Sequence, residues 1–164
     1  MIKTLTKHGN SLALVIEKPV LELIGADADT PFDISTDGQV LSLSEVLEIH
    51  QDQVARYGGA TGIRDIELLK SALGMPSATY GGQFLHTDVY EMAAAYLFHL
   101  VKNHPFIDGN KRVGAVTALI FLYLNGFDFG APADDFAEMV LAVARGDIDK
   151  ADVAVFIRRH TRPA

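Results

Sequence analysis

Apolar residues recur with two different periods along this chain, and the change falls near residue 44. Ahead of it, apolar and polar residues alternate, which is the period of a β-strand. Beyond it, apolar residues recur every three or four positions, which is the period of an amphipathic helix. The pattern therefore predicts two domains, residues 1–43 and residues 44–164, of which the first is β-rich and the second all-α.

The sequence of the first domain predicts a β–turn–β–α–β–β unit. HGNS is a turn signal within its opening alternation, and a short helix follows with Pro19 at its start and Gly25 at its end. Asp37-Gly38 marks the tight turn of a closing hairpin over residues 31–43. A unit of this length buries little core by itself. We therefore expect it to dimerise or to pack on its neighbour.

The second domain predicts a bundle of helices, the first capped by Ser44. The fourth is apolar nearly all round, so we expect it to be the buried central helix, ended by Gly126 in a left-handed conformation. Residues 74–86 are rich in Gly, Pro and small polar residues and predict a loop or short flap. The helices are expected over residues 44–57, 64–73, 88–103, 114–126, 133–146 and 149–160.

Composition narrows the class of protein. The chain is 49% hydrophobic and 21% charged, which is typical of a soluble globular protein. Its net charge of −7 argues against a dedicated nucleic-acid binder, because phosphate contacts need concentrated Lys and Arg. The absence of cysteine excludes disulfides and thiolate metal sites. With neither a long apolar run nor a signal peptide, we expect a cytoplasmic protein without a membrane segment.

Residues 104–114, HPFIDGNKRVG, concentrate polar side chains directly before the most apolar helix. Gly109 and Asn110 precede that helix, so the free N–H groups of its first turn form an anion site. Arg112 offers a bidentate fork for phosphate oxygens, and Lys111 adds a point charge.

Three further side chains complete this stretch. Asp108 is a hard oxygen ligand of the kind that holds Mg²⁺ beside a polyphosphate. His104 supplies an imidazole, the commonest general base. Phe106 is expected to bury inward and hold the loop. The residues alone leave two interpretations open: a phosphate site with a metal ligand and a base, or an ordinary capped loop with solvated cations.

HPFIDGNKR resembles the core motif of the Fic/Doc family, H-x-F-x-[DE/N]-[GA]-N-[GK]-R, at every patterned position. EIHQDQVARYGGATGIRDIELLKSAL and YLNGFDF are similar to the death-on-curing, or Doc, branch of that family. The resemblance covers essentially all of residues 44–160. It implies a mainly α fold, the Fic/Doc helical bundle.

The resemblance implies a role for each motif residue. His104 would be the general base that activates a hydroxyl of a target protein, and Asp108 would hold Mg²⁺. Gly109 and Asn110 would contact the phosphates of ATP, and Arg112 would clamp them. Lys102 stands where the Doc branch usually has Arg, and we include it among the expected phosphate-binding residues although it lacks the fork geometry.

The resemblance also implies that the flap holds the target as an extended strand by edge pairing. The residues expected there are Ser77, Ala78, Thr79, Tyr80, Gly81, Gly82 and His86.

Two positions separate the reactions known in the family. Members that transfer AMP have Gly where this chain has Lys111 and a second Arg where it has Ala115. The resemblance to the Doc branch implies a reversed nucleotide, whose γ-phosphoryl meets the hydroxyl. Phosphoryl transfer is therefore the favoured reaction, and AMP transfer the alternative. Ile49 replaces the Gly or Asn of the family's inhibitory helix, so we do not expect that brake here.

KHGNSLALVIEKPVLELIG resembles the AbrB/MazE-like swapped-hairpin domain, which dimerises and binds DNA. The expected DNA contacts are Lys3, Lys7, His8, Asn10 and Lys18, yet this domain has three Lys against six acidic residues. A degenerate dimerisation unit stays open as the alternative.

We therefore expect a Doc-like toxin that transfers the γ-phosphoryl of ATP, with Mg²⁺, to a Ser or Thr of a target protein. The resemblance implies translation elongation factor Tu as that target, and hence arrest of translation. A separate antitoxin, operator DNA and a second copy of the chain are the other expected partners. The alternative from a different class is a toxin–antitoxin regulator that binds DNA and has a silent Fic/Doc site.

Outside the motif, His50 and His99 lie on helices, and we expect His50 to be a core histidine whose hydrogen bonds are satisfied. The basic cluster FIRRHTR near the C-terminus is expected to be a solvated tail.

Overall fold

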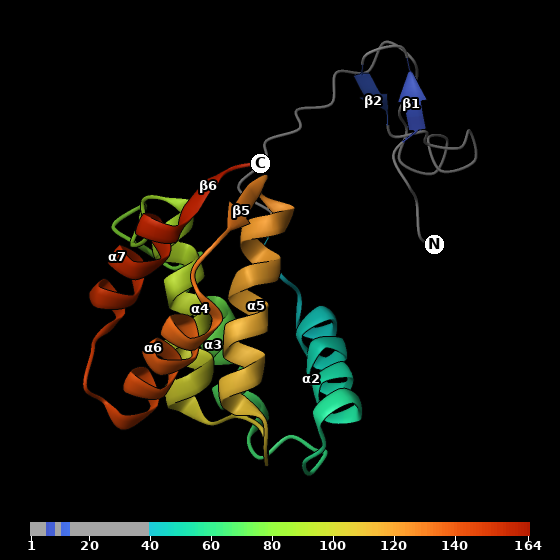
Figure 1. Cartoon of the computed structure of the whole chain (residues 1–164), viewed down its shortest axis with the longest axis vertical. Coiled ribbons are helices and arrows are strands. Elements are labelled where there is room, and N and C mark those ends of the chain that lie inside the picture. The colour runs from blue at the N-terminus through green and yellow to red at the C-terminus, as the bar shows by residue number, and fades with distance from the viewer. Residues whose placement is uncertain (1–5, 9–10, 14–39) are drawn as a thin grey trace. The chain divides into compact units, whose positions relative to one another are not determined.

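The computed structural model describes residues 6–8, 11–13 and 40–164 (Figure 1). The chain divides into two compact units, residues 1–35 and 36–164. In the first, β1 (Thr6–His8) and β2 (Ser11–Ala13) pair antiparallel, with Thr6 opposite Ala13 and His8 opposite Ser11. These are the two paired strands predicted on either side of the turn signal. The short helix and the Asp37-Gly38 turn predicted after it lie outside the described residues, as do Lys3, Asn10 and Lys18.

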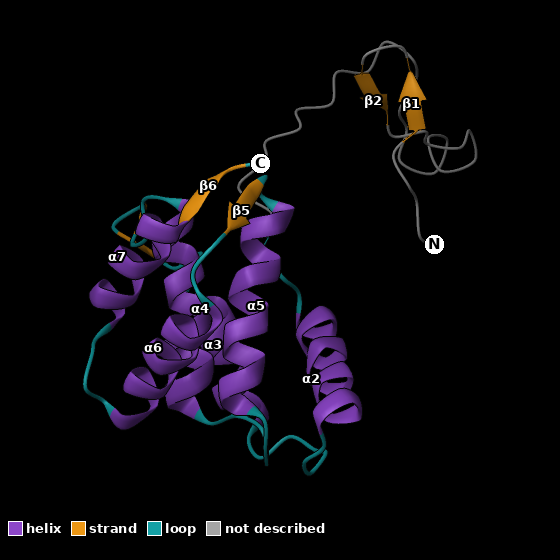
Figure 2. Ribbon diagram, viewed as in Figure 1, coloured by secondary structure: helices purple, strands orange, loops and turns teal. Residues whose placement is uncertain are grey.

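The second unit is built mainly of helices, which confirms the expected mainly α fold (Figure 2). The helices are α2 (Leu43–Tyr57), α3 (Ile66–Gly74), α4 (Val89–Asn103), α5 (Asn110–Leu124), α6 (Ala133–Arg145) and α7 (Lys150–His160). Two small antiparallel pairs accompany them, β3 (Thr79–Tyr80) with β4 (Gln83–Phe84), and β5 (Phe127–Phe129) with β6 (Thr161–Pro163). No helix in the part of the chain described here is both long and apolar enough to cross a bilayer.

Helix α2 begins at Leu43, one residue before the predicted range, because Ser42 and not Ser44 is its N-cap. Ser42 Oγ accepts the backbone N–H of Glu45, and the Glu45 carboxylate accepts the N–H of Ser42 at 2.7 Å. Only Ser42 has a Glu at the third helical position, as this reciprocal capping box requires. The strand predicted at residues 39–43 is therefore wrong over Val40–Ser42, which lead into the helix without forming a strand.

The central helix is α4, not α5 as predicted. Helix α4 packs against α3, α5, α6 and α7, and residues 93–97 are all fully buried. Helix α5 buries one face and exposes its last two residues, Tyr123 and Leu124, which are 73% and 41% accessible. The two helices approach closely at Gly114, where a Cβ would lie 2.9 Å from Val101 and 3.1 Å from the carbonyl oxygen of Leu97.

The C-terminal basic cluster is not the solvated tail that we expected. Strand β6 pairs with β5, and Arg162 lies opposite Asp128. The N–H of Gly130 donates to the carbonyl of His160 at 2.8 Å. The chain end is therefore bound to the segment that follows α5. The predicted left-handed glycine after α5 is confirmed, with Gly126 at a φ of 81°.

Candidate functional site

The motif loop (residues 104–109) starts with a backbone reversal at the end of α4. His104 has a φ of 47°, and it is the one residue other than Gly with positive φ among those described. Arg64 stabilises this turn, because its Nε donates to the carbonyl of His104 at 2.6 Å and its Nη2 to that of Asn103 at 2.8 Å. A cation at a helix C-terminus also complements the helix dipole. Our sequence analysis missed Arg64, since nothing local connects it to a helix end 40 residues later.

The segment before α3 supports the motif loop along its length. Ile63 and Phe106 form an antiparallel bridge, and the N–H of Ile107 donates to the carbonyl of Gly62 at 3.1 Å. The N–H of Arg64 donates to the carbonyl of Pro105 at 2.7 Å. The sequence predicted only a helix break here, but the segment acts as a short strand beside the loop.

Beneath the loop, Phe106 is 1% exposed and stacks on the ring of His50, with centroids 4.1 Å apart and planes 6° apart. His50 Nε2 donates to the carbonyl of Asp108 at 3.0 Å. His50 is thus a core histidine with a satisfied hydrogen bond, as predicted. Its hydrogen bond in addition supports the backbone of Asp108.

The side chain of Asn110 closes the loop internally. Its Oδ1 accepts the N–H of Phe106 and its Nδ2 donates to the carbonyl of Phe106, both at 2.9 Å. Asn110 is 7% exposed, so this amide is engaged inside the loop. Any phosphate contact of Asn110 would therefore fall to its backbone N–H.

Helix α5 begins at Asn110, four residues before the predicted start, so Lys111 and Arg112 belong to its first turn. Its N-cap is Gly109, with a φ of 84°, and no side chain caps the turn. The first N–H groups of a helix have no intrahelical acceptor, so here they are available to an anion.

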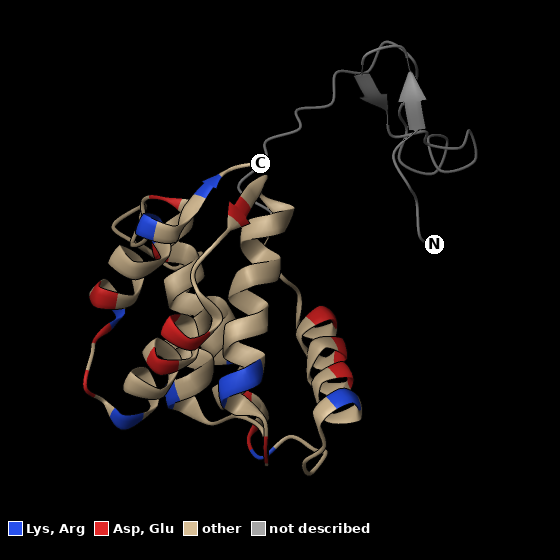
Figure 3. Cartoon of the chain, in the orientation of Figure 1, with Lys and Arg blue, Asp and Glu red and all other residues tan. Residues whose placement is uncertain are grey.

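These parts surround a cavity of about 290 Å³. The structure thereby brings together most of the residues that the sequence analysis selected. Blue basic residues gather at the lower end of α5 in Figure 3, close to acidic positions of the loop. The lining residues are His104, Ile107, Asp108, Gly109, Asn110, Lys111 and Arg112.

The carboxylate of Asp108 is exposed and held by backbone groups. Oδ1 accepts the N–H of Gly109 at 2.7 Å, and Oδ2 accepts the N–H of Ala60 at 3.3 Å. These two hydrogen bonds, with smaller contributions from the charges of Arg112 and Lys111, lower the pKa of Asp108. The carboxylate is therefore ionised at neutral pH, as a metal ligand must be.

Gly59 makes this arrangement possible. It has a φ of 120°, and a Cβ there would lie 2.4 Å from Oδ2 of Asp108. Only glycine lets the backbone approach the carboxylate so closely.

Asp108 fits Mg²⁺ as a single protein ligand. Within residues 40–164, no group of three or more His, Asp or Glu side chains is arranged to hold a metal ion. Mg²⁺ in phosphoryl-transfer sites commonly binds one or two carboxylates and completes its octahedron with substrate phosphates and water. A lone carboxylate beside an uncapped helix N-terminus suits that mode.

The predicted cations are arranged unequally. Arg112 donates from Nη1 to the carbonyl of Gln53 at 3.1 Å and from Nη2 to that of Gly58 at 3.0 Å, which ties α5 to α2. Lys111 is exposed at the cavity. Lys102 does not line the cavity, and a Cβ at Gly146, the C-cap of α6, would lie 3.5 Å from its Nζ.

The predicted flap is a small hairpin formed by β3 and β4. Gly81 and Gly82 make the turn with φ of 59° and 78°, the two positive values that a type I′ turn requires. Tyr80 is 83% exposed at the hairpin. Ser77 and Ala78 precede β3, and the carbonyl of Ala78 accepts the N–H of Leu85 at 2.9 Å.

His86 differs from the prediction that it belongs to the exposed flap. It is 6% exposed, and its Nε2 lies 2.9 Å from the ammonium of Lys150. The chain turns inward after β4 and buries this imidazole, which leaves it poorly placed to touch a target.

A family model described as Fic/DOC family matches residues 40–122 of the chain. Protein kinase doc of Escherichia phage P1 is 32% identical over 120 residues, which are 73% of this chain and 93% of the phage protein. Toxin Doc of Mycolicibacterium smegmatis is 38% identical over 100 residues, 60% of this chain and 77% of that toxin. A Fido domain-containing protein of Dictyostelium discoideum is 46% identical over 43 residues, 26% of this chain and 30% of that protein.

Proposed function

The chain belongs to the Fic/DOC family, and on that premise we propose that it is a Doc-like toxin that transfers the γ-phosphoryl of ATP to a Ser or Thr of a protein. The observation that carries the proposal is the cavity at the start of α5. It combines an imidazole, an ionised carboxylate, cations and an uncapped helix N-terminus within one continuous stretch of chain. These are the parts that phosphoryl transfer uses, since its catalysis consists chiefly of positioning and charge stabilisation.

In the proposed mechanism, His104 accepts the proton of the attacking hydroxyl. The hydroxyl oxygen bonds to the γ-phosphorus of ATP as the bond from that phosphorus to the β,γ-bridging oxygen breaks, and ADP leaves. The phosphates lie against the N–H groups of Asn110 and Lys111, where the helix dipole favours negative charge, because the N–H of Gly109 is already engaged with Asp108. The ammonium of Lys111 and the remaining N–H groups of Arg112 neutralise charge as it develops. Asp108 would hold Mg²⁺, which would supply positive charge that stabilises the phosphates.

Two features favour phosphoryl transfer over AMP transfer. Lys111 stands where the AMP-transferring members have Gly, and it adds a charged side chain at the cavity. Ala115 stands where they have a second Arg, and its methyl group, which lines a hollow with Phe136 and Val140, cannot clamp a phosphate. The phage relative is itself named a protein kinase.

For the protein target we propose translation elongation factor Tu, as the Doc-branch resemblance implies, with arrest of translation as the outcome. The flap would hold the target segment as an extended strand beside the hairpin, whose side chains at Tyr80 and Phe84 are exposed. Because a relative is named a toxin, we also propose that a separate antitoxin neutralises the chain.

The proposal is tested by the position of the transferred label. We would incubate the protein and Mg²⁺ with a bacterial translation extract and either γ-labelled or α-labelled ATP. Phosphoryl transfer predicts protein labelling from γ-labelled ATP only. It also predicts no labelling with His104→Ala and full labelling with His160→Ala, a histidine of α7 that hydrogen-bonds the carbonyl of Phe156. Labelling from α-labelled ATP would establish AMP transfer instead.

For residues 1–43 we propose an AbrB/MazE-like dimerisation domain that binds operator DNA. Lys7 lies in β1, opposite Leu12 of β2. Binding to DNA of the operator region should weaken steeply with salt and with Lys3→Met and Lys7→Met together. If residues 1–43 dimerise but bind no DNA, only the dimerisation role is supported.

A further inference from the structure

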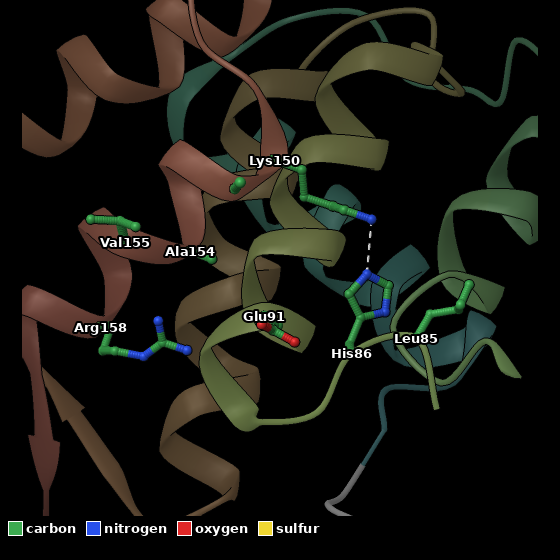
Figure 4. Close-up of a pocket in the computed structure, with 8 residues that line it drawn as sticks. Leu85, His86, Glu91, Lys150, Ala154, Val155 and Arg158 are labelled. Carbon is green, nitrogen blue, oxygen red and sulfur yellow. Dashed lines mark hydrogen bonds between the residues drawn. The ribbon is translucent and has the colours of Figure 1, made fainter. Parts of the chain in front are cut away.

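A second cavity, of about 490 Å³, shares no lining residue with the motif cavity. It lies between α4, α7 and the segment that follows β4, and the proposed transfer reaction uses none of it (Figure 4). We call it the α7 cavity. Its lining residues are Leu85, His86, Glu91, Lys150, Ala151, Ala154, Val155 and Arg158.

Lys150 is an uncompensated cation in this cavity. Its ammonium donates to Nε2 of His86 at 2.9 Å, so an imidazole occupies the place where a carboxylate would normally be found. Figure 4 shows the two side chains meeting at one side of the cavity, across from Val155 and Arg158. No Asp or Glu in residues 40–164 forms an ion pair with Lys150.

The other charges of the α7 cavity already have partners. Glu91 accepts the N–H of Thr87 at 2.7 Å and its hydroxyl at 3.2 Å. Arg158 pairs with Asp88 and lies over the ring of Tyr90. Of the two cations that line the cavity, Lys150 is therefore the one without a carboxylate partner.

Two neutral imidazoles adjoin Lys150 and have polar atoms to spare. Nδ1 of His86 and Nε2 of His99 are buried with no hydrogen-bond partner in the described part of the chain. Burial, and then the charge of Lys150, lower the pKa of both histidines, that of His99 to about 4. Buried polar groups normally have partners, and an anion at Lys150 would place a hydrogen-bond acceptor beside His86, the one of these two histidines that lines the cavity.

The mouth of the cavity is apolar. Leu85 and Val155 are 52% and 55% exposed, and the small side chains of Ala151 and Ala154 complete this side. One half-buried cation matches a single negative charge, whereas a phosphate dianion would bring excess charge against apolar walls. Sites of this size for small ligands typically combine apolar walls with a few convergent polar groups.

We propose that the α7 cavity binds a small organic monocarboxylate. Its carboxylate accepts hydrogen bonds from the ammonium of Lys150, and its aliphatic body lies against Leu85, Ala154 and Val155. This site is separate from the transfer reaction, so neither proposal depends on the other.

The test uses hexanoate as probe on the full chain, with the ¹⁵N resonances of the histidine rings observed by NMR. Hexanoate should shift the His86 and His99 rings saturably and raise the pH at which they titrate. Hexanol, which lacks the charge, and inorganic phosphate, which lacks the apolar body, should bind more weakly. Equal or stronger effects from hexanol or phosphate would overturn the proposal.

Variants locate the probe. Lys150→Met should weaken hexanoate binding about tenfold, the effect of losing one charge-assisted hydrogen bond. Lys70→Met is the matched control, because Lys70 lies exposed on α3 and pairs with Glu67. Should Lys150→Met fail to fold, Val155→Asp places a negative charge at the exposed mouth and should weaken binding similarly. Hexanoate binding that survives Val155→Asp unchanged would contradict the assignment.

Discussion

Replacing Asn110 tests how the motif loop keeps its shape. Asn110→Ala removes two hydrogen bonds of 2.9 Å and leaves both the N–H and the carbonyl of Phe106 without a partner. Phe106 is 1% exposed, so water does not easily replace them. Each unpaired buried group costs about 1–3 kcal/mol. We therefore expect the free energy of unfolding to fall by about 2–4 kcal/mol, at the low end if the loop opens to water.

Two comparison variants sharpen the experiment. Asn103→Ala removes a single bond of 3.2 Å, from Nδ2 of Asn103 to the carbonyl of Leu68, and should cost about 0.5–1.5 kcal/mol. Asn110→Asp keeps the acceptor for the N–H of Phe106 but turns a carboxylate oxygen toward its carbonyl. At neutral pH we therefore expect it to be clearly destabilised as well, even though its shape is unchanged.

The assay is urea unfolding followed by circular dichroism, in which a change of midpoint at constant slope reports a change of stability. The predicted order of midpoints is wild type, then Asn103→Ala, then Asn110→Ala. An Asn110→Ala midpoint equal to that of wild type would refute the reasoning. In that case the loop would not depend on the amide, and Asn110 would be free to contact phosphate through its side chain.

Three further predictions follow from the same geometry. Gly59→Ala should displace Asp108, because the new Cβ would lie 2.4 Å from Oδ2 of Asp108, and should lower Mg²⁺-dependent protein labelling at least about tenfold. Gly58→Ala is the control: the space around its Cβ is open, so it should lower stability without lowering the labelling. Arg64→Met should lower kcat more than it raises KM for ATP, with partial rescue in Arg64→Lys, because Arg64 holds the turn that carries the motif histidine; a KM effect alone would contradict this. Burial lowers the pKa of His99 from about 6.5 in the unfolded chain to about 4 in the folded chain. Between these pH values the unfolded chain binds a proton at His99 that the folded chain does not, so the free energy of unfolding should fall as the pH drops from about 6.5 to about 4. His99→Leu should flatten that part of the curve measured by thermal unfolding, and an unchanged slope would refute the assignment.

Local signals predicted the helices and the motif cavity well. The helical period located α4 and α6 closely, because an apolar face in contact with the core repeats along the sequence. Residues 104–112 form one cavity because they are consecutive and turn from one helix end into the next helix start. Short-range spacing was sufficient for these features.

The features that the sequence did not predict depend on contacts between distant residues. Arg64 is 40 residues from the carbonyl that it holds, and Lys150 is 64 residues from His86. Neither pairing leaves a periodic trace. The short strand β6 forms because α7 ends beside β5, where the chain can pair with that strand. The basic residues alone do not indicate this pairing, so the sequence predicted a solvated tail there. Both Ser42 and Ser44 could cap α2, and Glu45 selects Ser42 because only Ser42 has this Glu at the third helical position.

The most direct test of the proposed function is the intact mass of purified elongation factor Tu after incubation with this protein, ATP and Mg²⁺. The account predicts a gain of one phosphate mass, lost with His104→Ala and retained with His160→Ala. A gain of one AMP mass would contradict our interpretation of Lys111 and Ala115. An unchanged mass, with no labelled protein in the translation extract either, would contradict the assignment of a transferase.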